Sequence, residues 1–321
     1  NNRLSFDLTY YNGVMDHLYM EGSDASGIQP FTSAKVRNQG FETTIGYNFR
    51  LAKDVNWKTS YNVSYNSNKI LKTAYNDQGK ELIQQQVVGG TYIRYKEGGS
   101  IGDMYIHDFE RDANGNIALT RSGAPKFKSS GQDADLIYVG NMNAKWQMGW
   151  SNNFNYKDFT LSFLINGRIG GKVISLTEAY LDQYGLSQRV ADARLNAERN
   201  NIVATDYKNA PGMQLNDGSG RIVPVEAYYK AMGASTNPYN YIYNATNFRL
   251  RELSLGYTFR NLLGQNKNLN VAFIARNLFF LYNDRPVDPD VSLSTANGLG
   301  AFELFNMPSS RSFGLSLKLN F

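Results

Sequence analysis

Apolar and polar residues alternate over eight separate stretches of this chain. The stretches span residues 4–10, 41–49, 57–65, 144–150, 159–165, 248–259, 269–278 and 313–321. Because successive side chains of a β-strand point to opposite faces of a sheet, each stretch predicts a strand with one apolar and one polar face. Most stretches are close to the roughly ten residues that a tilted strand needs to cross a bilayer. The sequence therefore predicts an all-β, antiparallel fold of about eight strands.

The alternation changes its parity once, in the sixth stretch. Phe248 and Leu250 belong to one apolar set, and the set that begins at Leu253 follows after an odd step. A β-bulge, which inserts one extra residue into a strand, restores a common face. We therefore expect a bulge at Arg251 or Glu252.

The connections between the predicted strands fall into two classes that take turns along the chain. Short links follow Phe49, Phe154 and Phe259, whereas long links follow Tyr11, Tyr65, Ile165 and Leu278. Two of the long links run to roughly 75 residues, far above the usual two to six. Outer-membrane barrels have this asymmetry, with short periplasmic turns and long extracellular loops. The pattern predicts a transmembrane β-barrel segment, with the C-terminal Phe321 on the periplasmic side as an assembly signal.

The composition supports a membrane barrel over a soluble sheet. Charged residues make up 19% of the chain, below the roughly 25% of soluble domains, and aromatic residues reach 13%. No run of about 18 apolar residues occurs, so in a membrane the backbone polar groups must pair between strands. A soluble β-sandwich is the alternative, because its alternation would hide an apolar face in a core. A sandwich gives no reason for loops to be sorted by length, which favours the barrel.

Chemical sites are sparse. Cysteine is absent, and the net charge of +5 is scattered, so thiolate chemistry and nucleic-acid binding have no basis in the sequence. His17 and His107 lie far apart, in predicted loops, and neither neighbours a credible nucleophile. Residues 112–116 are similar to a calcium loop but lack its final Glu, so we expect a turn there. We expect a loop turn, rather than a cation site, at residues 288–290. The sequence thus predicts no catalytic group, no metal site and no cofactor.

Five passages, in order along the chain, carry a resemblance to a known family. They are GSIGDMY at residues 99–105; GQDAD at 131–135 with GN at 140–141; the 149–171 hairpin around YKDF; NFRLRELSLGY at 247–257; and RNL at 276–278, followed by DPD at 288–290 and residues 308–321. This set resembles the C-terminal part of the barrel of SusC/RagA-type TonB-dependent transporters, the nutrient importers of Bacteroides-like bacteria. Ala134 stands where the family usually has proline, and Asn143-Ala144-Lys145 replaces a common Pro-Lys pair.

The resemblance implies a location, a function and partners. The family has a plug domain and a barrel of about 22 strands, of which residues 1–321 would be the C-terminal part, without the plug and the N-terminal strands. It implies TonB-dependent uptake of a glycan oligosaccharide or a peptide across the outer membrane of a Gram-negative bacterium. The implied partners are a SusD-like surface lipoprotein, the TonB complex through the missing plug, the remaining barrel and plug segments, and outer-membrane lipid.

Two other functions compete with uptake. One is a self-contained eight-stranded barrel that acts as an adhesin or structural anchor, and the other is an outer-membrane enzyme, for which no catalytic group is found. Eight strands leave an interior that side chains just fill. Small residues on the polar face, such as Gly46, Gly149 and Gly314, favour a wider lumen. Since eight strands of a larger barrel cannot close, we expect Leu4 and Phe321 to lie on open edges.

Candidate functional residues fall into three groups. Tyrosines of the long loops offer rings for a sugar or a peptide side chain, although such a residue more often packs its own loop: Tyr92, Tyr95, Tyr105 and Tyr138. Polar residues are expected to line a solvated lumen: Lys58, Asn62, Lys145, Gln147, Arg168 and Lys318. Tryptophans near strand ends are expected in the interfacial aromatic girdle: Trp57, Trp146 and Trp150. Residues 177–201 are predicted to be helical, as a loop decoration.

Overall fold

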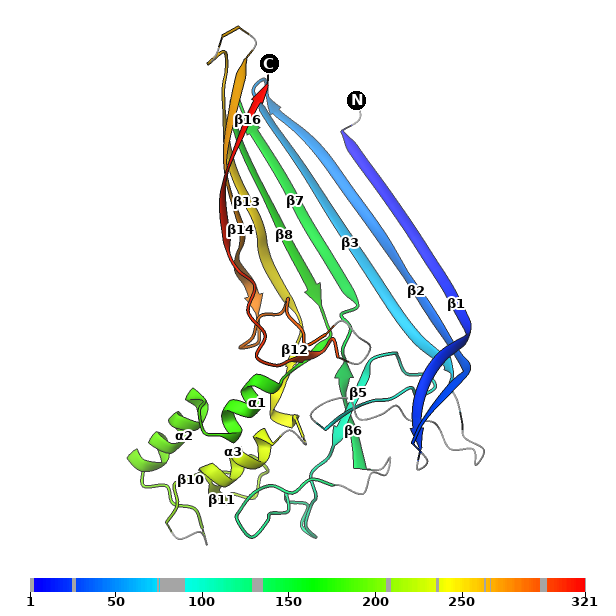
Figure 1. Ribbon diagram of the computed structural model, residues 1–321, viewed down its shortest axis with the longest axis vertical. Coiled ribbons are helices and arrows are strands. Elements are labelled where there is room, and N and C mark those ends of the chain that lie inside the picture. Colours follow the sequence, from blue (N-terminus) through cyan, green and yellow to red (C-terminus); the bar gives the residue numbers. More distant parts are fainter. Residues whose placement is uncertain are drawn as a thin grey trace.

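The computed structural model describes residues 3–24, 27–73, 75, 90–128, 135–205, 209–234, 237–262, 264–265, 267–294 and 299–320. Its main feature is an antiparallel sheet of eight strands (Figure 1). In spatial order these are β1 (Leu4–Asp24), β2 (Gly27–Ala52), β3 (Val55–Lys72), β7 (Trp146–Tyr156), β8 (Phe159–Ile169), β13 (Asn247–Phe259), β14 (Asn268–Asn283) and β16 (Ser312–Asn320). All eight predicted strands are therefore confirmed, and each pairs with its neighbours in chain order.

The link expected to be long after Tyr11 is not a loop. β1 and β2 instead continue as one hairpin, whose pairing runs to Asp24 opposite Gly27. The sequence concealed this extension because the alternation fades beyond residue 10, while backbone hydrogen bonds pair strands whatever side chains they carry. The other links are as expected: Ala52 to Val55 and Tyr156 to Phe159 are short turns.

The bulge in β13 lies where the alternation changes parity. Leu250 and Glu252 are consecutive partners of Ile165 and Leu164 on β8, so Arg251 is the extra residue. The pairing with β14 also shifts between Leu250 and Glu252, but there β14 carries the extra residue, because their partners Phe279 and Arg276 are three positions apart. The predicted bulge is confirmed, and it returns the apolar residues of β13 to the common face.

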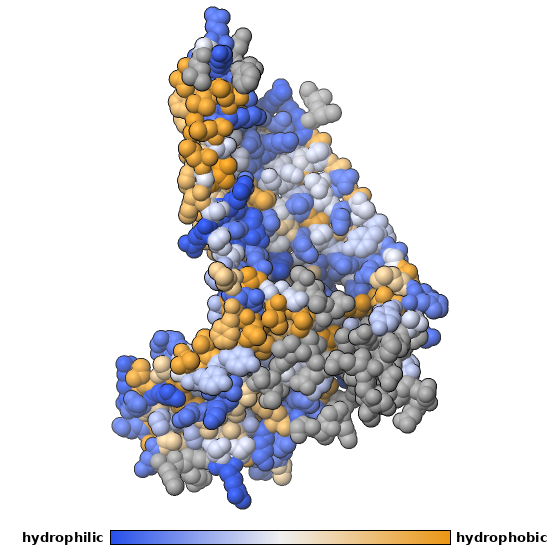
Figure 2. Space-filling view, viewed as in Figure 1, coloured by the Kyte–Doolittle hydropathy of each residue, from blue (hydrophilic) through white to orange (hydrophobic). Residues whose placement is uncertain are grey.

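One face of the sheet carries the apolar residues, and no other layer of the described residues covers it. The register sets Ile45 opposite Tyr61, and Tyr61 opposite Trp150. Ile45 is 44%, Tyr61 41% and Leu315 67% exposed. A soluble sandwich would bury these side chains beneath a second sheet. Figure 2 shows a largely hydrophilic face between β1 and β16, with apolar residues along the edge at β14 and β16. The exposed apolar face fits a wall that meets lipid.

The eight strands do not close into a ring. β1 and β16 are the two edges of the sheet, and no pairing joins them within the described residues (Figure 1). Leu4 lies on one edge, as expected, while Phe321 falls outside the described residues. An independent eight-stranded barrel would pair its first strand with its last. The open sheet is therefore a segment of a barrel, which disfavours the self-contained barrel.

The long connections form a lobe at one end of the sheet (Figure 1). It holds the sheets β4-β5-β6, β12-β9-β15 and β10-β11, and three α-helices. Their bounds are β4 (Thr91–Ile93), β5 (Asp103–His107), β6 (Leu136–Asn141), β9 (Lys172–Ser175), β10 (Gly212–Gln214), β11 (Ile222–Pro224), β12 (Ile242–Asn244), β15 (Phe302–Glu303), α1 (Leu176–Gln183), α2 (Gln188–Arg199), α3 (Val225–Gly233) and the 3-10 turn η2 (Tyr239–Tyr241). In the part of the chain that is described, no helix combines the length and the apolar character needed to span a membrane.

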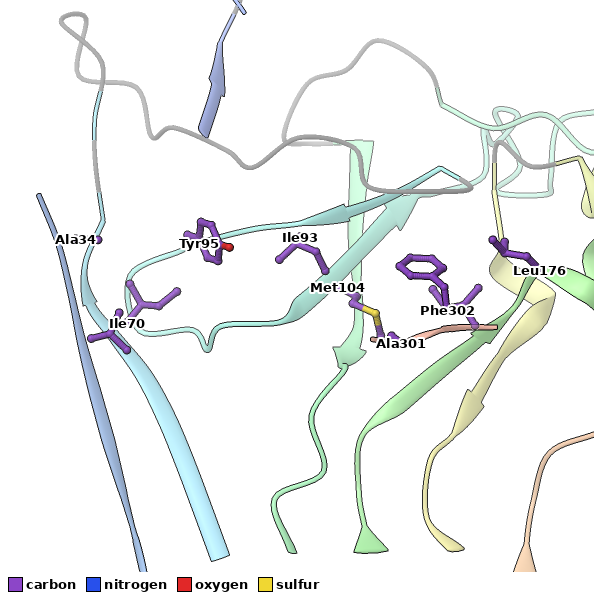
Figure 3. Packing of buried hydrophobic residues seen from close by; sticks show 10 residues of the cluster. Ala34, Ile70, Ile93, Tyr95, Met104, Leu176, Ala301 and Phe302 are labelled. Atoms are coloured by element: carbon purple, nitrogen blue, oxygen red, sulfur yellow. The ribbon is translucent and has the colours of Figure 1, made fainter. Parts of the chain in front are cut away.

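A buried apolar cluster ties this lobe to the end of the barrel wall. Ile70 of β3 is fully buried with Ile93 and Met104 of the lobe, and Phe302 extends the cluster towards α1 (Figure 3). Burying such side chains contributes about 1.5–3 kcal/mol each. The lobe is therefore packed against the wall rather than suspended from it.

The predicted helical segment 177–201 is confirmed, but as two helices. Gly185 takes a left-handed φ of 69° after α1, a conformation that ends helices. The Ser187 hydroxyl then accepts a hydrogen bond from the Val190 backbone N–H and begins α2. The sequence pattern showed the helical period but not the break.

Placing a charge on the lipid-facing side of β16 tests the assigned facing. We expect Leu317→Arg to destabilise the protein by about 2–4 kcal/mol if the residue lies near mid-bilayer. Ser316→Arg, on the opposite face of the same strand, is the matched control and should cost much less. Urea unfolding of the full-length protein in lipid vesicles measures both changes. Equal losses in the two variants would contradict the facing.

Candidate functional site

Three of the four candidate tyrosines form a ladder across one small sheet. Tyr92 on β4 lies opposite Tyr105 on β5, and Tyr105 lies opposite Tyr138 on β6. The rings of Tyr105 and Tyr138 are 5.4 Å apart between centroids, with a 59° angle between their planes. Tyr138 is 56% exposed, so one end of this tyrosine ladder is open to solvent. Such a surface suits a sugar ring or a peptide side chain, because aromatic faces bind apolar and C–H-rich groups.

Polar neighbours orient the ladder. The Tyr92 hydroxyl lies 3.0 Å from His107 Nε2, and the Tyr138 hydroxyl donates to Asp103 Oδ1 at 3.4 Å. The Arg94 guanidinium lies over the Tyr105 ring, 5.3 Å from its centroid. Burial raises the pKa of Tyr92, while burial and Asp103 raise the pKa of Tyr138. Both hydroxyls therefore stay protonated at neutral pH.

Tyr95 and the two histidines differ from expectation. Tyr95 is only 7% exposed and packs in the cluster of Ile70 and Met104, so it holds the lobe together rather than offering a free ring. His17 lies within β1 at a register shift, and His107 ends β5, so both belong to strands and not to loops. Tertiary packing of the long connection decided these positions.

Five of the six predicted lumen residues lie at one face of the large sheet. Lys58, Asn62, Gln147, Arg168 and Lys318 share the face opposite the apolar residues, and Lys145 directly precedes β7. A polar groove of 410 Å³ crosses β1, β2, β3, β7 and β8 on this face. Its lining includes the residues Asp7, Glu42, Asn62, Ser64, Gln147 and Asn166. The groove therefore exposes carboxylate, amide and hydroxyl groups.

Aromatic residues gather at two levels of the apolar face. Trp57 stacks on Phe49 at 4.9 Å, near the short turns, and Trp146 lies 4.7 Å from Tyr65, near the long loops. The two levels are about eight residues apart, or roughly 26 Å along a strand, close to the height of an outer-membrane apolar band. Trp150 is the fifth of the eleven residues of β7. The expectation that Trp150 lies near a strand end is therefore wrong.

The acidic turns are occupied by protein groups. Asp112 Oδ1 accepts from the backbone N–H of Asn114 and of Asn116, which makes a turn, as expected. Asp290 Oδ2 accepts from Arg249 and Arg251, each at 2.7 Å. Among the described residues, no three acidic or histidine side chains meet as a metal site would need.

Sequence reasoning missed this arginine–aspartate cluster. Arg249 is 3% exposed on β13, and its guanidinium also lies 4.5 Å from the centre of the Phe280 ring. Its bonds to Asp290 and to Ser309 tie the segment 284–311 to the polar face of the wall. The sequence feature that could have indicated this cluster is a pair of arginines two residues apart and a pair of aspartates two residues apart, which carry opposite charges. No local rule pairs them across 41 residues.

The chain matches known receptors along its length. No family model matches it. It is 23% identical to TonB-dependent receptor P3 of Formosa agariphila over 100% of this chain and 33% of that protein. It is 26% identical to TonB-dependent receptor P39 of the same organism over 80% of this chain, and 23% identical to TonB-dependent receptor SusC of Bacteroides thetaiotaomicron over 89%. These matches cover 28% and 26% of the two relatives, so the chain spans about a third of their length or less.

Solved structures agree with the fold. The RagAB peptide importer in its closed-closed state matches 100% of this chain and 34% of its own, with a TM-score of 0.68 and 18% identity. A second structure of the RagAB peptide transporter matches with a TM-score of 0.69 and 17% identity, over 33% of its chain. The chain is thus similar along its length to TonB-dependent receptors, and its large sheet has the fold of a segment of the matching RagAB chain. More narrowly, its predicted resemblance to the barrel portion of SusC/RagA-type transporters is confirmed. The named relatives are receptors, not enzymes.

The ladder should respond to pH through His107. Burial lowers the pKa of His107 below its ordinary 6.5, while Asp135 opposes the shift. The unfolded chain therefore binds the proton more readily, and stability decreases as the pH falls from about 6.5 towards the folded-state pKa. As the pH falls, amide hydrogen exchange in β4–β6 should become faster, after correction for the intrinsic pH dependence of exchange. His107→Asn should remove this response, whereas His17→Asn, at an exposed position, should retain it. If the pH response of exchange is unchanged in His107→Asn, protonation of His107 is not its cause.

Proposed function

We propose that this chain forms part of the wall and the outward loops of a TonB-dependent transporter. The transporter imports a glycan oligosaccharide or a peptide across the outer membrane of a Gram-negative, Bacteroides-like bacterium. Residues 1–321 correspond to the C-terminal part of its barrel, and other parts of a longer protein supply the plug and the remaining strands. A SusD-like surface lipoprotein covers the loops, and TonB acts through the plug.

One observation carries this proposal: the eight strands form an open arc with an apolar outer face, a polar inner face and a folded lobe at one end. A sheet with two unpaired edges needs further strands to be stable in a membrane, because unpaired backbone N–H and C=O groups are costly in lipid. The SusC and RagAB similarities support the same role. RagAB is a peptide importer, which keeps peptide beside glycan as the proposed cargo of this chain.

Growth after gene deletion tests the transport role. We expect the deletion strain to lose growth on one class of oligosaccharide or peptide supplied as the sole carbon source. The full-length gene should restore growth in a strain with TonB and fail to do so in a strain without it. Co-purification should also recover a surface lipoprotein with the full-length protein. Unimpaired growth and uptake on every glycan and peptide tested would count against import.

The tyrosine ladder is the proposed cargo contact of this segment. Removing an exposed ring should weaken cargo binding about three- to tenfold, the usual worth of one aromatic contact. We therefore expect Tyr138→Ala to lower the affinity of the full-length protein for its cargo by that factor. Tyr184→Ala removes a tyrosine that is 68% exposed but lies beyond α1, off the ladder, and should leave the affinity unchanged. Equal affinities in both variants would exclude the ladder as a cargo contact.

A further inference from the structure

A small cationic pocket lies where the outward end of the wall meets the segment 284–311. Its volume is about 100 Å³, and its lining includes Arg168 at the end of β8, Lys172 at the start of β9 and Arg285 after β14. Asp290 is the acidic residue in the lining. A pocket for a drug-sized molecule measures about 300–1,000 Å³, so this one accommodates a single small group.

The two guanidinium groups of the pocket are held by neutral partners. Arg285 is 8% exposed, and its Nη2 donates to the Ala245 carbonyl oxygen at 3.0 Å. Its Nε donates to Asn283 Oδ1 at 3.3 Å. Arg168 Nη2 donates to the Pro289 carbonyl oxygen. Within the described residues, no carboxylate forms an ion pair with Arg168, Lys172 or Arg285.

The nearby carboxylates are already engaged elsewhere. Asp290 Oδ2 accepts from both Arg249 and Arg251 at 2.7 Å. Asp288 Oδ2 accepts from the Ser309 backbone N–H at 2.9 Å and lies 3.8 Å from Arg249 Nη1. Among the described residues, the carboxylate that lines the pocket, that of Asp290, is thus paired with Arg249 and Arg251 and not with the three lining cations.

Burying this excess of positive charge in a partly enclosed pocket costs free energy of hydration. Burial, with Arg168 nearby, lowers the pKa of Arg285 to about 10. Arg285 still carries its charge at neutral pH, so its lost hydration is not compensated by an ion pair. Water can fill the space, but only an anion also neutralises the charge.

We propose that this pocket binds one oxyanion group, such as a sulfate, a phosphate or a carboxylate. The planar forks of Arg168 and Arg285 suit two oxygen atoms of such a group, and Lys172 adds a point charge. The group is either a free inorganic ion or an acidic substituent of an imported molecule. The site is distinct from the tyrosine ladder, since none of its lining residues belongs to β4, β5 or β6.

Sulfate titration tests the pocket in the full-length protein in detergent. Calorimetry with sodium sulfate, at an ionic strength held constant with sodium chloride, should show saturable binding. Lys172→Met should weaken it about tenfold, since one charge-assisted contact is lost. Lys96→Met removes an exposed lysine outside the pocket and should leave it unchanged. No saturable binding in the wild type, or equal affinities in the two variants, would overturn the proposal.

A second pair of variants keeps every cation in place. Among the described residues, a Cβ at Gly300, which lines the pocket, would meet Met142 Cε at 3.7 Å and the Ser294 carbonyl oxygen at 3.9 Å, and Gly300 is not among the glycines with positive φ. Gly300→Asp supplies a competing carboxylate and should reduce sulfate affinity about tenfold or more relative to its isosteric control, Gly300→Asn. Equal sulfate affinities in Gly300→Asp and Gly300→Asn would also overturn the proposal.

The source of the group follows from a third comparison. If glucose 6-sulfate binds more tightly than sulfate, and its affinity depends on Lys172 in the same way, the bound group is a substituent of the cargo. If glucose 6-sulfate binds equally or more weakly than sulfate, the bound group is a free ion. Both results support the oxyanion site. Binding is measured without transport, so its absence would leave the proposed uptake function untouched.

Discussion

The cross-strand register of the large sheet is the constraint on which the rest of the structure depends. Because side chains alternate with a period of two, a shift of one residue would move the whole apolar set of a strand to the polar face. The pairing sets Phe163 opposite Leu253, and Leu255 opposite Phe273. The extra residue Arg251 keeps β13 in step with β8, and an extra residue on β14 at the same level keeps β14 in step with β13. One face can therefore meet lipid while the other stays polar.

The lobe depends on that wall in two ways. Apolar packing joins it at Ile70 and Met104, and ion pairs join the segment 284–311 at Arg249. A buried ion pair is a weak source of net stability, but it is expensive to break, because one charge would remain unpaired. Arg249 thus specifies where the returning chain lies. The same junction brings Lys172 and Arg285 together and creates the cationic pocket.

The sequence was informative wherever a local period or a turn rule applied. The eight strands, the bulge at Arg251 and the turn at residues 112–116 all follow from such rules. The sequence did not predict the extension of β1 and β2 beyond Tyr11, because the paired residues there do not alternate between apolar and polar. It also misjudged Tyr95 and Trp150, because burial and depth along a strand depend on neighbours distant in the chain.

The sequence by itself determined the wall: a two-residue period must place alternate side chains on opposite faces, whatever surrounds them. Only the tertiary structure decided the sites. Tyr92, Tyr105 and Tyr138 become a ladder through pairing within one long connection. Arg249 and Asp290 meet across 41 residues. Contacts between residues so far apart in the chain depend on the three-dimensional course of the backbone, which no local pattern encodes.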